Sequence, residues 1–536
     1  MCCGYLSLDI EQFMAVQKRL LTGQIGVLNR SGIGRKIMQG HPQTVDEFRQ
    51  EVPLTTYLTY CPELLEKRED VLPEKPREWV HTSGRSGEYS CKWIPITASF
   101  ASELSPILYG IGMLSCCKGY GDTSRVVEHP NFIYTVAPRP YMSGAMAFML
   151  DEQTPSSYHP TLTEAENLPF EERIRLGFDK ALSCGVDYFF GLSLVLTSIG
   201  DRFSYSNSHP DLRPLITRPR ALLRLTKGMV KSRIARRRLL PRDLWNIRGI
   251  VTGGLDSSVY KEKIKEYWGR YPLDMYANTE GGVIATQTWD YDGMTFVPNL
   301  NFLEFIPEKE HFKWQLDHKY QPKTVLLDEV KAGECYEIVI TNFHGGALMR
   351  YRVGDMIRIT SLRNNNLNIG IPQMAFERRA DDLLDFATIR LSEKAIWKAI
   401  EGSGLPYQDW VAYKSPGDLT LNLLIEPAGD RQINEKELEN TIYHQIIKGE
   451  IEAFASQAHQ DAIKASKLEI KIKILPRGSF ADYTAQKKVE GAELAHLKPP
   501  HINPPPQVLS RLLAQDGKPA ESAIKAPSQK TSVSIG

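Results

Sequence analysis

The sequence lacks an excess of charge of either sign, an apolar run long enough to cross a bilayer and a secretory signal. Its 65 Lys and Arg residues offset 64 Asp and Glu residues, for a formal net charge of +1, which argues against a general attraction to nucleic acid or anionic membrane. The longest apolar candidate, Tyr188 to Gly200, is too short for a transmembrane helix and contains Ser and Thr. No basic segment followed by an apolar stretch opens the chain, so we expect a cytoplasmic protein.

The cysteines lack the spacing of a zinc or redox site. None of the eight is arranged as C-x-x-C, and two vicinal pairs occur, Cys2-Cys3 and Cys116-Cys117. Reduced and mostly buried thiols are therefore expected. Acylation of Cys2 and Cys3 stays open as an alternative, although stable anchoring to a membrane would need a second signal.

The pattern along the chain predicts an α/β protein of two domains and a tail. Up to about Arg379, helical patterns alternate with short β-rich runs, which favours layered α/β structure. Residues 380–500 predict a smaller α+β domain, with helices over 391–401 and 435–454 and strands at LTLNLLIEP and LEIKIKILP. From residue 501 to 536 the composition turns to Pro, Ser, Ala and Lys, which predicts a disordered tail.

Two local patterns add detail. YEIVITN and RYRVGDMIRIT flank Gly345-Gly346, which predicts a tight hairpin. A second pattern predicts a basic amphipathic helix, with an apolar face and, opposite it, a run of cations: Leu222, Leu225, Met229, Val230 and Ile234 against Arg220, Arg224, Lys227, Lys231 and Arg236 to Arg238. Such a helix can meet a membrane or nucleic acid. Because the net charge is balanced, we expect a solvated face instead.

Five short segments carry the residue types of a nucleotide site. HTSGRSGEYSCK, residues 81–92, joins two strand-like runs and offers backbone N–H groups, hydroxyls and cations to an anion, without the G-K-[ST] ending of a Walker loop. VTGGLDSS, residues 251–258, places two glycines after a strand, where a flat ring can approach the backbone. MYANTEGG, YRVGD and RRADDLLD begin at residues 275, 351 and 378. Each segment alone is equally compatible with an ordinary turn.

Their order resembles that of the adenylate-forming superfamily. There, corresponding segments are the phosphate loop, the adenine platform, the adenine-and-magnesium motif, the ribose motif and the hinge between domains. Three stretches are similar in sequence to the acyl-acid amido synthetases first known as auxin-responsive plant proteins. They are FVPNLNFLEFIPE (296–308), GECYEIVITNFHGGALMRYRVGD (333–355) and GAELAHLKPPH (491–501). The resemblance covers roughly residues 79–501. It implies a large N-terminal domain, residues 1–379, with layered α/β structure and a β-barrel-like subdomain, and a small mobile C-terminal domain.

The resemblance also implies an ATP site. Its residues would hold the phosphates, the adenine and the ribose: Thr82, Ser83, Gly84, Ser86, Gly87, Gly253, Gly254, Tyr276, Thr279, Asp355 and Arg379. Glu280 would bind Mg²⁺, and Lys498 would offset charge between the acid's carboxylate and the α-phosphate. Arg85 stands where most relatives have Thr, and its guanidinium would either grip phosphate or obstruct turnover. Asp385 occupies the hinge position.

The implied reaction is ATP-dependent activation of a carboxylic acid as its acyl-adenylate, with release of pyrophosphate. Transfer of the acyl group to an amine, which includes amino acids, would follow. Two alternatives stay open. An acid–CoA ligase is favoured by the motif T-E-G-G, which stands in place of the plant family's usual S-S-E motif. A nucleotide-binding pseudoenzyme or scaffold is favoured by Arg85. Residues 132–148 mix aromatic and small side chains and would line either the acyl pocket or ordinary core. The shared motifs encode neither the acid, the acceptor nor the oligomeric state.

Overall fold

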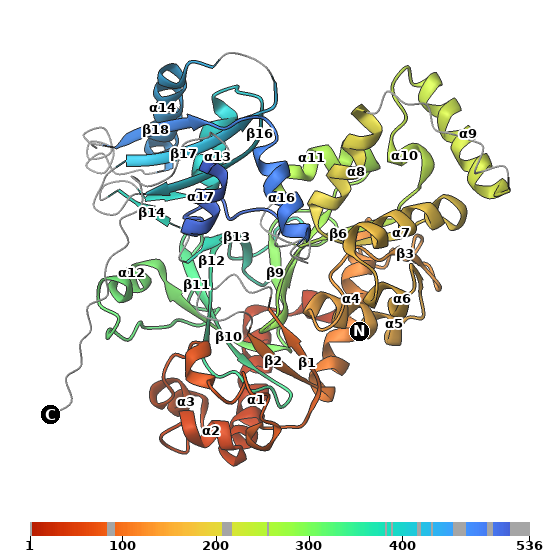
Figure 1. The fold of residues 1–536 in the computed structure, drawn as a ribbon. Coiled ribbons are helices and arrows are strands. Elements are labelled where there is room, and N and C mark those ends of the chain that lie inside the picture. Colours follow the sequence, from red (N-terminus) through yellow and green to blue (C-terminus); the bar gives the residue numbers. More distant parts are fainter. Residues whose placement is uncertain are drawn as a thin grey trace. The chain divides into compact units, whose positions relative to one another are not determined.

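The computed structural model describes residues 3–82, 92–205, 217–253, 257–380, 383–386, 390–414, 420–429, 433–453, 468–489 and 497–514 (Figure 1). The chain divides into two compact units, Met1–Glu377 and Arg378–Gly536. This division lies two residues before the end that the sequence predicts for the large domain. The two units are described in turn.

The large unit contains one sheet with a parallel half and an antiparallel half. The strand order is β10-β11-β12-β13-β9-β8-β7-β6-β5-β3-β4. The parallel half consists of β4 (Ser157–His159), β3 (Asn131–Ile133), β5 (Tyr188–Gly191), β6 (Gly249–Thr252) and β7 (Leu273–Asn278). The antiparallel half consists of β8 (Gly282–Thr286), β9 (Met294–Phe296), β13 (Gln373–Arg379), β12 (Tyr351–Ser361), β11 (Cys335–Asn342) and β10 (Asn301–Pro307). The described strands of this half form one row that ends at β10, so the barrel-like subdomain stays a prediction.

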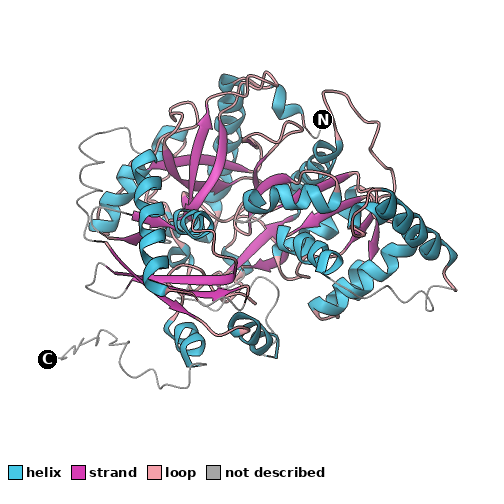
Figure 2. Cartoon of the chain, turned by 90° about the horizontal axis from the view of Figure 1, so that it is seen from above, coloured by secondary structure: helices cyan, strands magenta, loops and turns pink. Residues whose placement is uncertain are grey.

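The sheet joins segments that are far apart in the sequence. Both of its faces are covered. Every residue of β8 and of β11 is buried, as expected for strands with packing on both sides. The helices of the unit are α1 (Ile10–Arg30), α2 (Gly32–Ile37), α3 (Val45–Glu51), α4 (Ala98–Cys116), α5 (Met142–Gln153), α6 (Leu162–Glu166), α7 (Phe170–Cys184), α8 (Ser193–Tyr205), α9 (Pro219–Ile234), α10 (Pro241–Leu244), α11 (Ser257–Trp268) and α12 (Glu308–Leu316). Figure 2 shows helices lying along the strands. Short 3-10 turns occur at Gly4–Ser7, Tyr57–Tyr60 and Glu69–Val71.

Helix α1 fastens the N-terminal segment to the antiparallel half. Asp9 caps the helix in a reciprocal capping box with Gln12, which satisfies backbone N–H groups that the first turn leaves open. Two buried glutamines on this helix bond to distant backbone. Gln17 Nε2 donates to the carbonyl of Asn301 at 2.7 Å, and Gln24 Nε2 donates to the carbonyl of Gly346 at 2.9 Å. The helix therefore holds both the start of β10 and the connection between β11 and β12.

The predicted hairpin is confirmed in its pairing and wrong in its turn. Strands β11 and β12 are antiparallel neighbours, with Val339 opposite Arg352 and Ile340 opposite Tyr351. Residues 343–350 connect them, so the turn is long rather than tight. The extra length brings the backbone of Gly345 and Gly346 to Gln24 of α1.

The small unit is a three-stranded sheet with a helical layer on each face. Strand β17 (Thr420–Pro427) lies between antiparallel β16 (Tyr407–Lys414) and parallel β18 (Glu469–Ile474). Helices α13 (Glu393–Gly402) and α14 (Glu435–Ala453) pack on Trp410, Leu423 and their neighbours. Helices α16 (Ser479–Val489) and α17 (Pro506–Ala514) pack on the other face. A short hairpin, β14 (Leu383–Asp385) with β15 (Arg390–Ser392), precedes α13.

Four predicted elements of the small domain are confirmed, namely α13, α14, β17 and β18. The prediction of a disordered tail from residue 501 is wrong for residues 501–514. Helix α17 contributes Val508, Leu509 and Leu512 to a core with Val411 and Phe480. Proline and small residues dominate the composition after residue 501, but these three apolar residues, with the partly buried Leu513 beside them, are enough to cover a sheet face. The tail beyond residue 514 lies outside the described residues.

Replacement of Leu512 tests the role of α17. Leu512 is 1% exposed, so Leu512→Ala is expected to lower the unfolding free energy by about 2–5 kcal/mol through lost burial and a cavity. Urea unfolding followed by circular dichroism measures the effect. Gln507→Ala, at an exposed position of the same helix, is the control. Equal stability of the two variants would contradict the packing of α17 on the sheet.

Candidate functional site

The predicted phosphate loop, residues 81–92, begins and ends beside two paired strands. Strands β1 (Pro76–His81) and β2 (Trp93–Thr97) are antiparallel, as their strand-like sequences predict. At the base of this segment, Thr82 N donates to the carbonyl of Lys92 at 3.0 Å, and Lys92 N donates to Thr82 Oγ1 at 3.2 Å. Ser83, Gly84, Arg85, Ser86 and Gly87 lie outside the described residues. Their expected phosphate contacts stay predictions.

Lys92 connects the base of this segment to the predicted magnesium residue. Lys92 Nζ donates to Tyr351 Oη at 3.4 Å, and the Tyr351 hydroxyl donates to Glu280 Oε1 at 3.4 Å. Tyr351 is 1% exposed. Burial, together with the charge of Glu280, raises the pKa of Tyr351 well above its usual value, so the phenol stays a hydrogen-bond donor. The sequence motifs identified Glu280 but gave no sign of this Lys92–Tyr351 link.

A network of asparagine side chains fixes the turn that carries Glu280. Asn342 Nδ2 donates to the carbonyl of Glu280 at 2.9 Å and to Asn301 Oδ1 at 2.8 Å. Asn301 Nδ2 donates to the carbonyl of Gly281 at 2.7 Å, and Gly281 N donates to Asn278 Oδ1 at 2.7 Å. The Asn278 amide nitrogen is buried without an acceptor among the described residues. A bound water or ligand that supplies an acceptor would satisfy this donor.

The predicted adenine and ribose residues contact each other. Tyr276 lies on β7 and Asp355 on β12, and the Tyr276 hydroxyl donates to Asp355 Oδ2 at 2.6 Å. Both are buried, at 8% and 4% exposure. The Tyr276 ring lies 6.0 Å from the Phe376 ring at a tilt of 35°. Three motifs thus come together: the base of the 82–92 segment, the motif of Tyr276 and Glu280, and the motif of Tyr351 and Asp355. The first and the last are about 270 residues apart along the chain.

The remaining predicted nucleotide residues have different outcomes. Gly253 directly follows β6, and a Cβ there would lie 3.3 Å from the carbonyl oxygen of Met275, next to Tyr276 on β7. Its neighbour Gly254 lies outside the described residues. Thr279 is half-buried in the turn before Glu280. Arg379 is exposed at the end of β13, and its expected support of the ribose stays a prediction. Asp385 ends β14 in the second unit.

The fit to Mg²⁺ follows from the donor set. The described residues contain no cluster of three or more His, Cys, Asp or Glu side chains arranged to hold a metal ion. Glu280 therefore offers a single carboxylate, which fits Mg²⁺ bound by one or two carboxylates together with substrate phosphates and water. It does not fit a metal site built from protein ligands alone.

Lys498 belongs to a charge cluster of the small unit in which Asp409 and His501 are largely buried, while Lys498 itself is exposed. Its Nζ lies 2.9 Å from Asp409 Oδ2, and Asp409 Oδ1 lies 2.9 Å from His501 Nε2. His501 Nδ1 in turn lies 2.5 Å from Glu393 Oε1. Burial lowers the pKa of His501, but its two carboxylate partners outweigh burial and raise that pKa to about 9. Burial raises the pKa of Asp409, but His501 and Lys498 outweigh it and lower that pKa to about 2. The sequence motifs identified Lys498 and missed its three neighbours.

Residues 132–148, the suggested acyl-pocket segment, divide between core and cavity. Tyr134, Met142 and Ala145 are buried in the main core. Phe132 lines a small apolar cavity with residues of α4, α5, β5 and the connections before β3 and after α5: Leu108, Tyr109, Gly112, Met113, Val126, Val127, Pro130, Leu150, Thr154, Ser156, Tyr188 and Phe190. The cavity has a volume of only about 20 Å³, room for about one water molecule. The described part of the segment therefore serves mainly the core, and its role in an acyl pocket stays a prediction.

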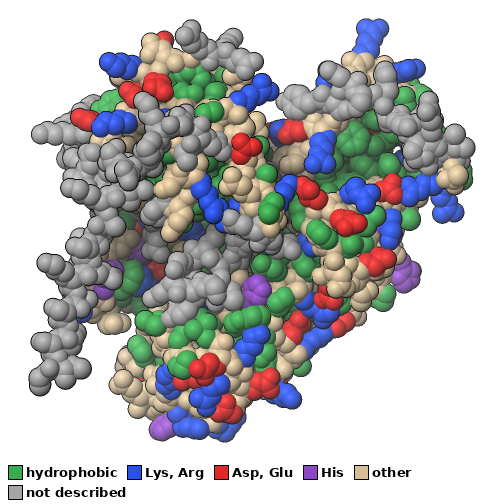
Figure 3. Space-filling view, viewed as in Figure 1, with side chains coloured by type: hydrophobic (Ala, Val, Ile, Leu, Met, Phe, Trp, Pro, Cys, Tyr) green, Lys and Arg blue, Asp and Glu red, His purple; other side chains and the backbone are tan. Residues whose placement is uncertain are grey.

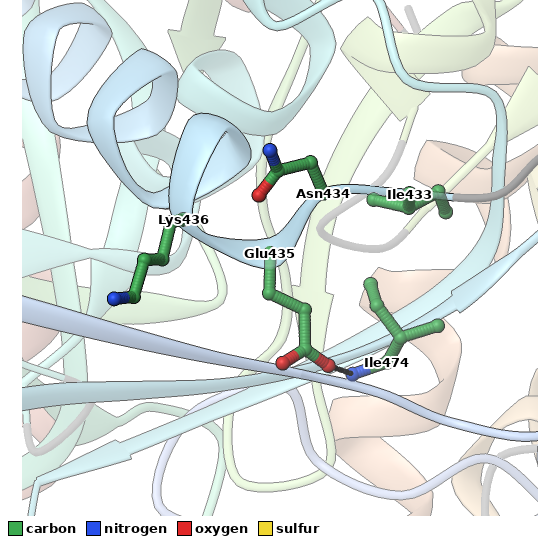
Figure 4. Close-up of a pocket in the computed structure, with 5 residues that line it drawn as sticks. All are labelled: Ile433, Asn434, Glu435, Lys436 and Ile474. Atoms are coloured by element: carbon green, nitrogen blue, oxygen red, sulfur yellow. Dashed lines mark hydrogen bonds between the residues drawn. The ribbon is translucent and has the colours of Figure 1, made fainter.

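A larger hollow, of about 390 Å³, lies at the start of α14 and contains none of the predicted site residues (Figure 4). Ile433, Asn434, Glu435, Lys436 and Ile474 line it. The Glu435 carboxylate accepts a hydrogen bond from Ile474 N at 3.2 Å, and Glu439 accepts one from Ile472 N at 3.0 Å. These carboxylates satisfy N–H groups of edge strand β18, which explains the hollow without a ligand.

The predicted basic helix is confirmed as α9, but its buried face is not the predicted one. The helix buries Leu225, as the sequence predicts, together with the small residues Ala221, Gly228 and Ser232. It leaves Val230 and Ile234 exposed at 57% and 78%. Arg224, expected on the solvated face, donates to the carbonyls of Ala181 and Leu182 at the end of α7. Acidic and basic side chains are interspersed on the visible surface (Figure 3). No helix among the described residues is both long and apolar enough to cross a membrane.

Comparison with known families places two domains in the chain. Residues 5–124 match the GH3 family N-terminal domain, and residues 294–379 match the GH3 family central domain. A jasmonoyl–L-amino acid synthetase of Nicotiana attenuata, JAR4, is 36% identical over 163 residues, which are 29% of this chain and 26% of the relative. The 4-substituted benzoates–glutamate ligase GH3.12 of Arabidopsis thaliana is 32% identical over 202 residues, 35% of this chain and 31% of the relative. The aligned parts thus span about a quarter to a third of these relatives.

Solved structures extend the likeness to the whole fold. The AtGH3.15 acyl acid amido synthetase, in complex with 2,4-DB, has a TM-score of 0.65 and 17% identity over 95% of this chain and 94% of that one. A 2-hydroxyisobutyryl-CoA ligase in the postadenylation state has a TM-score of 0.57 and 14% identity over 95% and 93%. These likenesses confirm the predicted fold of a large and a small domain, and the two domain matches, which together cover less than half of the chain, agree with the family resemblance.

Loss of the Tyr276 hydroxyl tests the coupling of the two nucleotide motifs. Tyr276→Phe leaves the buried Asp355 carboxylate without its 2.6 Å donor, and is expected to lower the unfolding free energy by about 1–3 kcal/mol. Urea unfolding measures the change. Tyr120→Phe, at a tyrosine 64% exposed, is the matched control and is expected to change little. A Tyr276→Phe protein as stable as this control would contradict the contact.

The charge cluster predicts a pH dependence of stability. The pKa of His501 is raised from 6.5 to about 9, so its stabilising contribution is complete below pH 6.5 and is lost as the pH rises through about 9. As the pH rises from 7 to 10, we expect the thermal midpoint of the wild type to decrease more than that of His501→Gln, which lacks this group. Calorimetry or fluorescence melts across this range measure it. Parallel pH profiles of the two proteins would show that His501 is not an imidazolium in the folded state.

Proposed function

We propose that this chain, which carries the N-terminal and central domains of the GH3 family, is an ATP-dependent acyl-acid amido synthetase. It activates a carboxylic acid as its acyl-adenylate, releases pyrophosphate, and transfers the acyl group to an amine to form an amide. The observation that carries the proposal is the convergence of three motifs in the large unit: the base of the 82–92 segment, Glu280, and the Tyr276–Asp355 pair.

The chain's own residues supply positioning and charge. Asp355 accepts hydroxyls of the ribose, while Tyr276 and the Gly253-Gly254 turn bracket the adenine ring. The predicted phosphate loop, with Arg85 among its hydroxyl and glycine residues, holds the phosphates. Glu280, oriented by Tyr351, holds Mg²⁺, which supplies charge compensation to the phosphates when bound.

The adenylation step needs little covalent chemistry from the protein. A carboxylate oxygen attacks the α-phosphorus in line, the bond to the pyrophosphate oxygen breaks, and pyrophosphate carries away the electron pair. Two anions must approach each other for this attack, so a cation between them lowers the barrier. We assign this role to Lys498 of the small domain. Rotation of the small domain near Asp385 would then remove the lysine and admit the amine.

The names of the relatives suggest the first substrates to test. They include jasmonoyl, indole-3-acetic acid and 4-substituted benzoate ligases. The second candidate function, an acid–CoA ligase, shares the first half-reaction. It is supported by T-E-G-G at residues 279–282 and by the CoA ligase of like fold. The acceptor, not the adenylation, distinguishes the two.

Acid-dependent ATP–pyrophosphate exchange tests the proposal. Purified protein with Mg²⁺ is expected to exchange label in the presence of at least one acid of an aryl, fatty and plant-hormone panel. Amino acids, other amines and CoA, added to that acid, then identify the acceptor by mass spectrometry of the product. ATP binding without exchange for any acid would refute the enzyme and leave a pseudoenzyme, for which Arg85→Thr would be the restoring variant.

Two substitutions test the assigned residues within the same assay. Lys498→Ala is expected to lower exchange by about 100-fold or more and Glu280→Gln by about 10-fold or more, with ATP still bound, because each removes charge compensation in the transition state. Lys471→Ala, at an exposed lysine on strand β18 of the same domain, is the control. Unchanged exchange in Lys498→Ala would mean that the catalytic lysine lies elsewhere.

A further inference from the structure

Four charged side chains from separate segments of the small unit form one chain of contacts. Glu393 begins α13, Asp409 lies on β16, and Lys498 and His501 lie on the segment before α17. The sequence of contacts is Glu393 Oε1 to His501 Nδ1 at 2.5 Å, His501 Nε2 to Asp409 Oδ1 at 2.9 Å, and Asp409 Oδ2 to Lys498 Nζ at 2.9 Å. Two carboxylates are thus balanced by two cations.

The geometry fixes His501 as an imidazolium. Both of its ring nitrogens face carboxylate oxygens, which only accept hydrogen bonds, so both nitrogens must carry a proton. The ring stacks on Trp410 at 4.4 Å and 13°, and it meets the edge of Trp397 at 5.2 Å. Its side chain is 11% exposed. No other titratable group appears among the contacts that surround this ring in the described residues.

The same histidine anchors the segment that carries Lys498. The carbonyl of His501 accepts a hydrogen bond from Ala412 N at 2.6 Å, and Asn503 N donates to the carbonyl of Ala412 at 2.9 Å. Ile502, between them, is 3% exposed in the core of the small unit. The segment therefore lies beside β16 as a short added strand, and the root of the Lys498 side chain is fixed three residues before this anchor.

We propose that the Glu393–His501–Asp409 chain is the positioning device of Lys498: it fixes the lysine-bearing segment on β16 and lets Lys498 leave Asp409 for the phosphates without leaving a buried carboxylate uncompensated. The proposal deepens the proposed function and rests on it, since it takes Lys498 as the adenylation lysine. Asp409 and His501 are positioning residues and do not touch the substrate in this account.

Asp409 contacts two cations at once, which makes the departure of Lys498 possible. Lys498 and His501 use different oxygens of the carboxylate, so one cation can leave while the other stays. Lys498 is 41% exposed and His501 is 11% exposed, so the lysine is the cation with access to solvent. Removal of one partner from a buried ion pair is strongly unfavourable when the other charge is left alone. His501 removes that penalty for Lys498.

Glu393 completes the device from the other side. It binds His501 Nδ1 and so keeps the imidazolium from depending on Asp409 alone. The register of β16 shifts between Tyr407 and Asp409, and such an irregularity re-aims a side chain relative to a regular strand. The serine that caps α13, Ser392, directly precedes Glu393 and accepts from Ala395 N at 3.2 Å, which fixes the start of the helix that presents the glutamate.

The test is a double-mutant cycle in ATP–pyrophosphate exchange with full-length protein. In His501→Gln, Asp409 keeps a hydrogen-bond donor but loses its second charge, so Lys498 is held at Asp409. We expect kcat to fall by about tenfold or more while KM for ATP changes by less than about threefold. Asp409→Asn removes the carboxylate charge that holds Lys498, so His501→Gln is expected to lower kcat much less in the Asp409→Asn background than in the wild type. The double variant is expected to recover most of the loss of His501→Gln.

Recovery in the double variant is the readout that a purely structural role would not give. Loss of packing adds with each substitution, so a double variant as slow as His501→Gln, or slower, would overturn the proposal. Glu439→Gln is the matched control: its carboxylate accepts from Ile472 N on β18 of the same domain, and β18 is separated from β16 by β17. Thermal midpoints of all variants identify any unfolded protein.

The outcomes separate this proposal from the proposed function. Wild-type exchange that Lys498→Ala abolishes and His501→Gln leaves untouched would refute the positioning role alone. Wild-type protein without exchange for any acid would refute the proposed function, and the positioning role with it. Exchange that survives Lys498→Ala would refute the lysine assignment on which both rest.

Discussion

Burial of carboxylates, and the need to give each one a donor or a cation, is the constraint on which the candidate site depends. A carboxylate removed from water is unfavourable unless hydrogen bonds or opposite charges replace its hydration. Asp355 meets the Tyr276 hydroxyl, Glu280 meets the Tyr351 hydroxyl, and Asp409 meets Lys498 and His501. The partners come from other segments of the chain, so each pairing also fixes one motif against another.

The same constraint explains why the site residues occur on strands and on turns that buried side chains fix. Tyr276 and Asp355 face each other from β7 and β12, which belong to one sheet whose neighbouring strands are held by regular hydrogen bonds. Glu280 lies on a turn rather than on a strand. Hydrogen bonds between the side chains of three asparagines and the backbone fix this turn in place of strand pairing. In the small unit the lysine segment joins β16 through His501 and Asn503. Preorganisation of this kind is what a reaction that depends on position and charge requires.

The sequence predicted the parts that depend on local pattern and ordered motifs. The Y-x-x-T-E and Y-R-x-G-D motifs and the lysine segment predicted Tyr276, Glu280, Asp355 and Lys498 as site residues, and the roles of these residues stay predictions. Periodicity predicted α13, α14, β17 and β18, which the structure confirms. The sequence could not predict Lys92, Tyr351 or His501 as their partners, because those contacts depend on how distant strands meet. It also missed α17, whose apolar residues are few and follow a proline run, and the buried face of α9, where small residues decide the packing.

The fate of the acid's oxygen tests adenylation most directly. With an acid that supports exchange, labelled with ¹⁸O in its carboxylate, and with the acceptor present, AMP should be recovered with one ¹⁸O in its phosphate, because an acyl-adenylate breaks at the acyl carbon when the amine attacks. Mass spectrometry of the AMP reads the label. Unlabelled AMP, or label found in inorganic phosphate beside ADP, would contradict an acyl-adenylate intermediate and with it the central claim.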